Sequence, residues 1–247
     1  MAFALITGAS QGLGKSLANQ LAKRKIDLIL ISLKNEGLLD LGKALEKQYG
    51  VCVHCYETDL SHTDNVLSLA EKINRNHNIN VLINNVGIGL VKNPIPFDKL
   101  NMIDDNFWKQ IMQVNLMSAF YCSRASAKYL KEKKGAIVNL TSISSSGKRG
   151  TSIPYAVSKG SLNTLTRSLA KSLAPDVRVN AVSPGFTITN MTRQRSKLHK
   201  EKMAKQTLLK RNAKPKEIAE IIFMLCVSGS FMTGEIINVD GGHGYIY

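Results

Sequence analysis

The sequence has no long hydrophobic run, few aromatic residues and few acids. Its longest apolar stretch, Ile221–Val227, is far shorter than the ~20 residues that a membrane-spanning helix needs. Aromatic residues make up only 6% of the chain, and no stretch interleaves them with basic residues as nucleic-acid-binding modules do. We therefore expect neither a membrane protein nor a nucleic-acid-binding protein. Because a strand-like segment begins at Ala2, we also expect no signal peptide and a cytoplasmic location.

Cysteine is scarce as well, at four residues, two of which form the C-x-x-C pattern of Cys52 and Cys55. Within the expected strand Val51–Thr58, residues three apart point to opposite faces, so the two thiols could not share a metal ion or act as a redox pair. No second Cys/His pair has the spacing of metal ligands. We therefore expect structural thiols in a reducing compartment, and no metal site.

Acidic residues number 18 against 33 Lys and Arg, which gives a formal net charge of +15 at pH 7. Much of the excess is local, since the segment from Arg193 to Lys216 contains ten basic residues and a single acid, Glu201. Such a segment either attracts an anionic substrate or partner, or is simply a helix with its charges in solvent. Both interpretations remain open from the sequence.

Short apolar runs alternate with longer amphipathic stretches along the chain. The expected strands are Phe3–Thr7, Leu28–Ser32, Val51–Thr58, Val81–Asn84, Ala136–Thr141, Arg178–Val182 and Ile236–Val239. The expected helices include Lys15–Lys23, Leu38–Tyr49, Val66–Asn74, Phe107–Lys131 and Val157–Leu173. The first strands are apolar nearly throughout, as when helices cover both faces of a parallel sheet. We therefore predict one α/β domain over residues 1–247, a doubly wound parallel sheet of about seven strands with helices on both faces.

A glycine-rich loop connects the first expected strand to the first expected helix. It reads Thr7-Gly8-Ala9-Ser10-Gln11-Gly12-Leu13-Gly14, with the spacing G-x-x-x-G-x-G. Glycines let a backbone turn tightly and approach a pyrophosphate, whose charge then lies at the positive end of the helix. Taken alone, the loop would also fit a turn that serves only packing.

Together with the motifs that follow it, this loop resembles the T-G-x-x-x-G-x-G motif of the short-chain dehydrogenase/reductase family. The other matching segments, in the family's order, are Asp59-Leu60, Asn84-Asn85-Val86-Gly87, Val114-Asn115-Leu116, Ile137-Val138-Asn139-Leu140-Thr141-Ser142, Tyr155-x-x-x-Lys159 and Ser183-Pro184-Gly185. Val86 replaces the family's Ala, a change that we expect the fold to tolerate. The resemblance implies a Rossmann-type fold and hydride transfer between NAD(P)(H) and a carbonyl or alcohol.

Tyr155 and Lys159 are four residues apart, so both project from one face of a helix. A free phenol, with a pKa of ~10, is a weak base at neutral pH, but a neighbouring ammonium favours the phenolate and lowers that pKa. We expect Tyr155 to be the general acid/base, which protonates the carbonyl oxygen as hydride arrives on carbon. In isolation, Y-x-x-x-K would be an ordinary exposed helix pair; the accompanying motifs favour catalysis.

Two further residues complete the expected catalytic group. Ser142 lies thirteen residues before Tyr155, the family's spacing, and its hydroxyl would stabilise negative charge on the substrate oxygen. Its nearby rivals for this role are Ser144, Ser145 and Ser146. By resemblance, Asn115 holds a water molecule that relays protons to Lys159, which itself binds the nicotinamide ribose. The alternative for Asn115 is a helix asparagine that bonds local backbone.

By resemblance, the cofactor is bound at the carboxyl ends of the strands. The expected contacts are Gly8, Ser10, Gln11, Gly12, Leu13, Gly14, Ser32, Lys34, Asp59, Leu60, Asn84, Gly87, Tyr155, Lys159, Pro184, Gly185, Thr187 and Thr189. An acid at the end of the second strand would bind the adenosine 2′-hydroxyl of NAD, but this chain has Ser32 there, and Lys34 could meet a 2′-phosphate. Gln11 and Leu33, however, stand where NADP-dependent relatives often have basic residues. The balance favours NADP(H) over NAD(H).

The basic segment at about 187–214 corresponds, by resemblance, to a lid over the substrate. The pattern from Pro184 to Thr192 resembles 3-oxoacyl-acyl-carrier-protein reductases, which implies a 3-oxoacyl thioester on an acidic carrier protein or CoA as the favoured substrate. The arginines that bind the carrier in such reductases are not evident, since Ala136 and the Pro175–Asp176 turn stand in their places. The resemblance also implies a homotetramer.

Two other functions remain open. Within the same family, the substrate could be a sugar, a steroid or another small secondary alcohol or ketone. In a different class, the chain could be a cofactor-binding regulator, or a nucleic-acid-binding protein, that uses its basic surface without turnover. A non-catalytic relative would be expected to lack one of the four catalytic residues, and this chain has all four.

Overall fold

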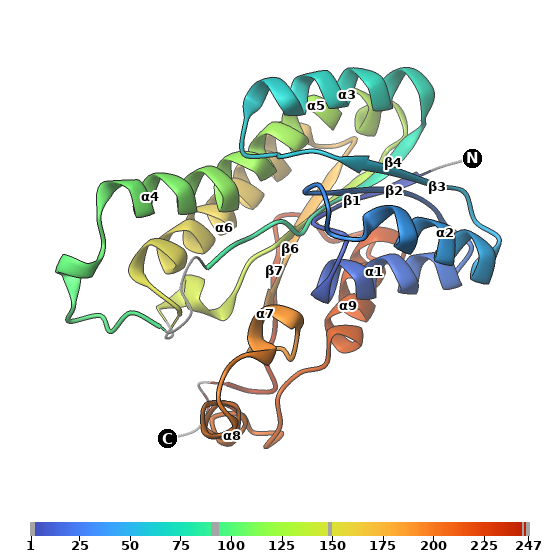
Figure 1. The fold of residues 1–247 in the computed structure, drawn as a ribbon. Helices are drawn as coiled ribbons and strands as arrows, with labels where there is room; N and C mark the ends of the chain where they lie inside the picture. The colour runs from blue at the N-terminus through green and yellow to red at the C-terminus, as the bar shows by residue number, and fades with distance from the viewer. Residues whose placement is uncertain (1–2, 90–93, 148–149, 244, 246–247) are drawn as a thin grey trace.

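A parallel sheet of seven strands, in the order β3-β2-β1-β4-β5-β6-β7, forms the centre of the structure (Figure 1). The structure is a computed structural model, and it describes residues 3–89, 94–147, 150–243 and 245. The strands are β1 (Phe3–Thr7), β2 (Asp27–Ser32), β3 (Val53–Glu57), β4 (Ile79–Asn84), β5 (Ala136–Leu140), β6 (Arg178–Pro184) and β7 (Ile236–Val239). The predicted doubly wound sheet is confirmed, and each predicted strand overlaps an observed one.

Helices cover both faces of this sheet (Figure 1). They are α1 (Gly12–Lys23), α2 (Leu38–Tyr49), α3 (Thr63–Asn76), α4 (Asp105–Met112), α5 (Ser118–Glu132), α6 (Ile153–Leu173), α7 (Asn190–Arg193), α8 (Lys197–Lys205) and α9 (Pro215–Val227). One hydrophobic cluster joins α1, α2 and α9 to the sheet, and a second joins α3, α5 and α6 to its other face. The short helices α7 and α8 lie apart from both layers.

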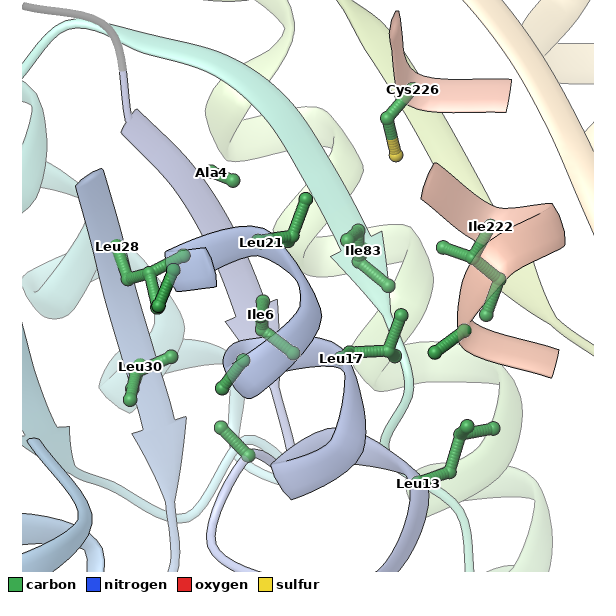
Figure 2. Close-up of a cluster of buried hydrophobic side chains, with 14 of the residues drawn as sticks. Ala4, Ile6, Leu13, Leu17, Leu21, Leu28, Leu30, Ile83, Ile222 and Cys226 are labelled. Carbon is green, nitrogen blue, oxygen red and sulfur yellow. The ribbon is translucent and has the colours of Figure 1, made fainter. Parts of the chain in front are cut away.

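Alternate residues of the buried strands supply the two clusters. In Figure 2, Ile6 of β1 lies between Leu30 of β2 and Leu17 of α1, with Ile222 of α9 on the other side of Leu17, and all four belong to one cluster. The residues between them, such as Leu5 and Ile29, belong to the cluster on the opposite face. Burying each of these side chains stabilises the fold by about 1.5–3 kcal/mol, which explains why the strands are apolar throughout.

The long helix expected over 107–131 is interrupted by a π-helical turn, Gln113–Met117, between α4 and α5. Apolar periodicity continues through the turn, so the sequence pattern did not reveal it. Helix α6 also begins four residues earlier than expected, because Ser152 Oγ caps it by accepting a hydrogen bond from the backbone N–H of Tyr155. Both differences bear on the site, since they determine how Asn115 and Tyr155 are presented.

The two cysteines of the C-x-x-C pattern face opposite sides of the sheet, as predicted. Cys52 packs against the cluster of α3, α5 and α6, and Cys55 against the cluster of α1, α2 and α9. All four cysteines are free thiols. Within the described ranges, no group of three or more His, Cys, Asp or Glu side chains could hold a metal ion, and no helix is long and apolar enough to cross a membrane.

Candidate active site

Three glycines shape the loop between β1 and α1. Gly8 and Gly12 have φ angles of +64° and +55°, in the left-handed region that favours glycine. Gly14 has an ordinary conformation, but a Cβ atom there would overlap the carbonyl oxygen of Gly8. The loop therefore follows a backbone path that other residues could not take.

The N-terminus of α1 is suited to an anion. Its N-cap residue, Gln11, makes no side-chain cap hydrogen bond, and the first turn contains no acidic residue. The backbone N–H groups of a first helical turn have no partner inside the helix, and the helix dipole adds positive potential there. Together with the glycine path, this arrangement fits the pyrophosphate of a dinucleotide.

Asn85 anchors this loop, although sequence reasoning did not place it among the site residues. Its side-chain amide donates to the carbonyl oxygens of Thr7 at 3.0 Å and Gly8 at 2.9 Å. The hydroxyl of Thr7 in turn accepts the backbone N–H groups of Asn85 and Val86. The signal was present in the N-N-V-G motif, which contains Asn85. The Val86 side chain packs against Gly8, so the fold accommodates this departure from the family pattern.

Asn84, by contrast, is committed to the interior of the protein. Its side-chain amide donates to Asn139 Oδ1 at 2.9 Å and to Ser123 Oγ at 3.1 Å, and the amide of Asn139 continues to Thr166 on α6. This buried network ties β4 to β5, α5 and α6. The structure thus directs the Asn84 side chain away from the rim of the sheet, while Asn85 and Gly87 of the same motif lie at the rim.

Strand β5 and helix α6 bring together three of the four predicted catalytic residues. Ser142 follows β5, and its hydroxyl lies close enough to Tyr155, in the first turn of α6, to lower the pKa of that phenol. The Lys159 ammonium lies 6.0 Å from the centre of the Tyr155 ring and donates to the carbonyl oxygen of Leu140 at 2.8 Å. A Cβ atom at Gly87 would lie 3.0 Å from Lys159 Nζ, so glycine keeps this space open.

Asn115, the fourth predicted residue, lies fully buried in the π-helical turn. Its side-chain oxygen accepts the backbone N–H of Ile88 at 2.7 Å, and its amide donates to the carbonyl oxygen of Ile88 and to Ser158 Oγ. The backbone that it binds is therefore not local, but belongs to the segment after β4. Asn115 joins that segment to α6 one residue before Lys159, and its role in proton relay remains a prediction.

The ionisation of the catalytic pair is governed by burial. Burial raises the pKa of the Tyr155 phenol, although its hydrogen bond to Ser142 acts in the opposite direction. Burial also lowers the pKa of the Lys159 ammonium to about 8. The sequence led us to expect a lowered pKa for Tyr155, but in the protein without cofactor the effect of burial is larger than that of Ser142, so the pKa is raised.

The residues expected around the adenosine are divided between interior and surface. Ser32 is buried, and its hydroxyl donates to the carbonyl oxygen of Leu33, whereas Lys34 is exposed. Leu60 lies in the core beside Asp59, whose carboxylate accepts the backbone N–H of Ser61. Sequence reasoning did not include Glu36, which accepts a hydrogen bond from the hydroxyl of Ser10 at 2.6 Å and so joins the segment after β2 to the glycine loop.

The segment after β6 returns to the glycine loop. The Thr187 hydroxyl donates to the carbonyl oxygen of Gly185, which follows Pro184, the last residue of β6. Thr189, the N-cap of α7, lies 3.5 Å from where a Cβ atom at Gly12 would be. These expected cofactor contacts therefore lie along the same rim as the glycine loop.

The basic segment forms α7, α8 and an irregular return. Its two ends pair, with the Ile188 N–H donating to the carbonyl oxygen of Ala213 at 3.0 Å. Beyond this pairing, the guanidinium of Arg211 makes two hydrogen bonds to Glu217 and holds the pKa of that carboxyl at about 2. The exposed cations of the segment are Arg193, Lys197, Lys202, Lys205, Lys210, Arg211 and Lys214. The segment is thus fixed at its base and strongly cationic outside.

The glycine loop and the group of Ser142, Tyr155 and Lys159 define a nicotinamide-dependent oxidoreductase. A family model described as "Enoyl-(Acyl carrier protein) reductase" matches residues 8–244. The chain is 34% identical over 242 residues to 3-oxoacyl-[acyl-carrier-protein] reductase of Aquifex aeolicus, covering 96% of this chain and 95% of that protein. It is 31% identical over 241 residues to meso-2,3-butanediol dehydrogenase of Serratia marcescens, covering 96% and 92%.

The solved structures give the same result. A 3-oxoacyl-[acyl-carrier protein] reductase with bound NAD from Brucella melitensis superposes with a TM-score of 0.86 at 25% identity, covering 98% of this chain and 90% of that one. The chain belongs to the short-chain dehydrogenase/reductase family and is an NAD(P)-dependent enzyme of that family.

Burial of Lys159 makes the stability of the protein depend on pH. Its pKa is about 8 in the folded protein against an ordinary 10.5, so between these values the unfolded chain binds more protons and stability rises with pH. Below about pH 8 the full cost of the buried charge is present. We expect Lys159→Met to gain roughly 1–3 kcal/mol over the wild type at pH 7, a gain that shrinks toward pH 10.

Urea unfolding at a series of pH values measures this difference. Lys171→Met, at an exposed position on the same helix, is the matched control and should follow the wild type. Parallel stability curves for the wild type and Lys159→Met would mean that the ammonium is not desolvated.

Proposed function

We propose that the protein reduces the carbonyl group of a 3-oxoacyl thioester with NADPH. The observation that carries this proposal is the convergence of two hydroxyls, with Ser142 close enough to Tyr155 to lower the pKa of its phenol, beside the Lys159 ammonium at the mouth of the sheet. Two such hydroxyls can donate to one oxygen atom. They suit the oxygen of a carbonyl, on which negative charge develops as its carbon accepts hydride.

Each residue has a distinct role in this reaction. The nicotinamide ring, when bound, supplies the hydride. Tyr155 gives its phenolic proton to the substrate oxygen, and Ser142 donates a hydrogen bond to the same atom. Lys159 stabilises the phenolate left on Tyr155, and the phosphate loop of Gly8, Gly12 and Gly14 positions the dinucleotide.

The choice of a thioester substrate rests on the relatives and on the basic segment. The chain is 34% identical to a reductase named for 3-oxoacyl groups on acyl carrier protein. Three large apolar side chains of this segment, Leu198, Leu208 and Leu209, are exposed among its cations. A surface of this kind fits an acyl chain delivered by an anionic carrier. Ala136 is buried in β5 and offers no charge to a carrier, whereas the basic segment at 187–214 presents exposed cations that would attract one.

Turnover with a panel of substrates tests this proposal. NADPH oxidation is measured with acetoacetyl groups on carrier protein, CoA and a neutral thiol, and with free ketones and sugars. We expect kcat/KM to be at least about tenfold higher for the thioesters. The advantage of the carrier-bound substrate should fall as salt screens the lysines.

Tyr155→Phe should lower kcat by about a hundredfold or more while leaving cofactor affinity nearly unchanged.

Other outcomes would select the competing functions. Faster turnover of a sugar or small secondary alcohol would favour a dehydrogenase like the butanediol enzyme among the relatives. Cofactor binding without turnover of any substrate would indicate a regulator.

A preference for NADP(H) belongs to the same proposal. Strand β2 ends in a neutral, buried Ser32, and Lys34 beside it is exposed and able to meet a 2′-phosphate. We expect a lower dissociation constant for NADPH than for NADH by fluorescence titration. Lys34→Glu should weaken NADPH binding roughly tenfold and change NADH binding little, while Gly14→Ala should bind neither. Tighter binding of NADH by the wild type would refute the preference.

The proposal includes a homotetramer in the cytoplasm. Strand β7 is at the edge of the sheet, and Val227 and Phe231, which precede it in the chain, are exposed large apolar side chains that a second copy could cover. Four unpaired thiols suit a reducing compartment. A mass of about four subunits by light scattering is expected, and a mass of one subunit would exclude the assembly. Recovery of the protein outside the cytoplasm on fractionation would exclude the location.

A further inference from the structure

Ser142 accepts two hydrogen bonds from one neighbour, Ser144. The backbone N–H of Ser144 donates to Ser142 Oγ at 3.3 Å, and the hydroxyl of Ser144 donates to the same atom at 2.9 Å. The first of these bonds makes Ser142 the N-cap of the short 3₁₀ helix Ile143–Ser146. The hydroxyl of Ser142 also lies close enough to Tyr155 to lower the pKa of its phenol.

A serine hydroxyl has two acceptor positions and one proton. With both acceptor positions filled by Ser144, the oxygen of Ser142 can only donate in its remaining direction, toward the oxygen of Tyr155 or of a substrate. We propose that Ser144 is a positioning residue, which fixes Ser142 as a hydrogen-bond donor to the reacting oxygen. This inference deepens the proposed carbonyl reduction and rests on it.

The other serines of this loop are directed elsewhere. Ser145 Oγ accepts a hydrogen bond from the side-chain amide of Asn163 at 2.8 Å. The hydroxyl of Ser146 donates to the carbonyl oxygen of Ile143 at 2.9 Å. Of the three rivals for the role of Ser142, only Ser144 is hydrogen-bonded to its hydroxyl, and the side chains of the other two serve the structure of the loop.

Ser144 cannot itself reach a substrate, because it is 2% exposed. It is packed against Gly150, where a Cβ atom would lie 2.9 Å from the Cβ of Ser144 and 3.4 Å from a ring carbon of Tyr155. The absence of a side chain at Gly150 thus lets this serine pair approach the Tyr155 ring. Ser144 therefore acts through Ser142 and is not a catalytic residue.

Removing the Ser144 hydroxyl would reopen one acceptor position on Ser142. Ser142 could then accept the proton of the Tyr155 phenol, an orientation that stabilises the neutral phenol and withholds the proton from a substrate. The positive group facing Tyr155 from α6, the Lys159 ammonium, would be unaffected. A change in the pKa of Tyr155 would thus report the orientation of Ser142.

The test compares Ser144→Ala with Ser146→Ala, which removes a hydroxyl from the same helix without touching Ser142. We expect Ser144→Ala to lower kcat about fivefold to tenfold with KM changed less than about twofold, because one hydrogen bond to the reacting group is lost. The pKa of Tyr155 should rise in this variant. It is measured from phenolate absorbance, as the difference between each protein and its Tyr155→Phe derivative. Ser146→Ala should match the wild type in both measurements.

An unchanged Tyr155 pKa in Ser144→Ala would overturn the inference. Equal losses in Ser144→Ala and Ser146→Ala would do so as well, since they would indicate only a loosened loop. The titration needs neither cofactor nor substrate. If the wild type reduces no carbonyl compound, the proposed function fails, and the titration still decides whether Ser144 orients Ser142.

Discussion

The placement of one buried ammonium group constrains the rest of the site. Lys159 is 3% exposed, and burial lowers its pKa to about 8, so the fold holds a cation where water cannot easily stabilise it. Its compensation is local: the carbonyl oxygen of Leu140 accepts its hydrogen bond at 2.8 Å, and Gly87 leaves it room. A protein selected for stability alone would replace such a group, and the proposed reaction gives it a role, since it would stabilise the phenolate left on Tyr155.

The surrounding scaffold can be understood as the support for this ammonium. The amide network of Asn84, Asn139 and Thr166 ties β4 and β5 to the middle of α6, while Asn115 ties the segment after β4 to the helix beside Lys159. Asn85 fixes the glycine loop to the end of the same strand, β4. The glycine loop and the first turn of α6 are therefore joined through one strand and its hydrogen-bonded amides, which would maintain their relative position in the proposed reaction.

Much of this arrangement was predictable from the sequence, because it depends on patterns with strict spacing. Buried parallel strands need unbroken apolar runs, and the glycine loop needs residues without a Cβ, so both can be recognised in the amino-acid sequence. The Y-x-x-x-K spacing likewise implies one helical face. The sequence patterns did not predict the features that depend on how the elements pack in the folded protein. The π-helical turn at Asn115 keeps the apolar period, and the direction of the Tyr155 pKa depends on how deeply the phenol is buried. Asn84 and Asn85 are neighbouring residues of the same type, yet the side chain of Asn84 lies in the interior and that of Asn85 at the rim of the sheet.

The most direct test of this account is the pKa of Lys159 in the protein without cofactor. It can be followed by NMR of the labelled ε-carbon, with the resonance assigned by its absence in Lys159→Met. We expect a titration midpoint near 8, well below the ordinary value of 10.5. A midpoint at the ordinary value of 10.5 would show that the ammonium is solvated, and would contradict the claim that its burial organises the site.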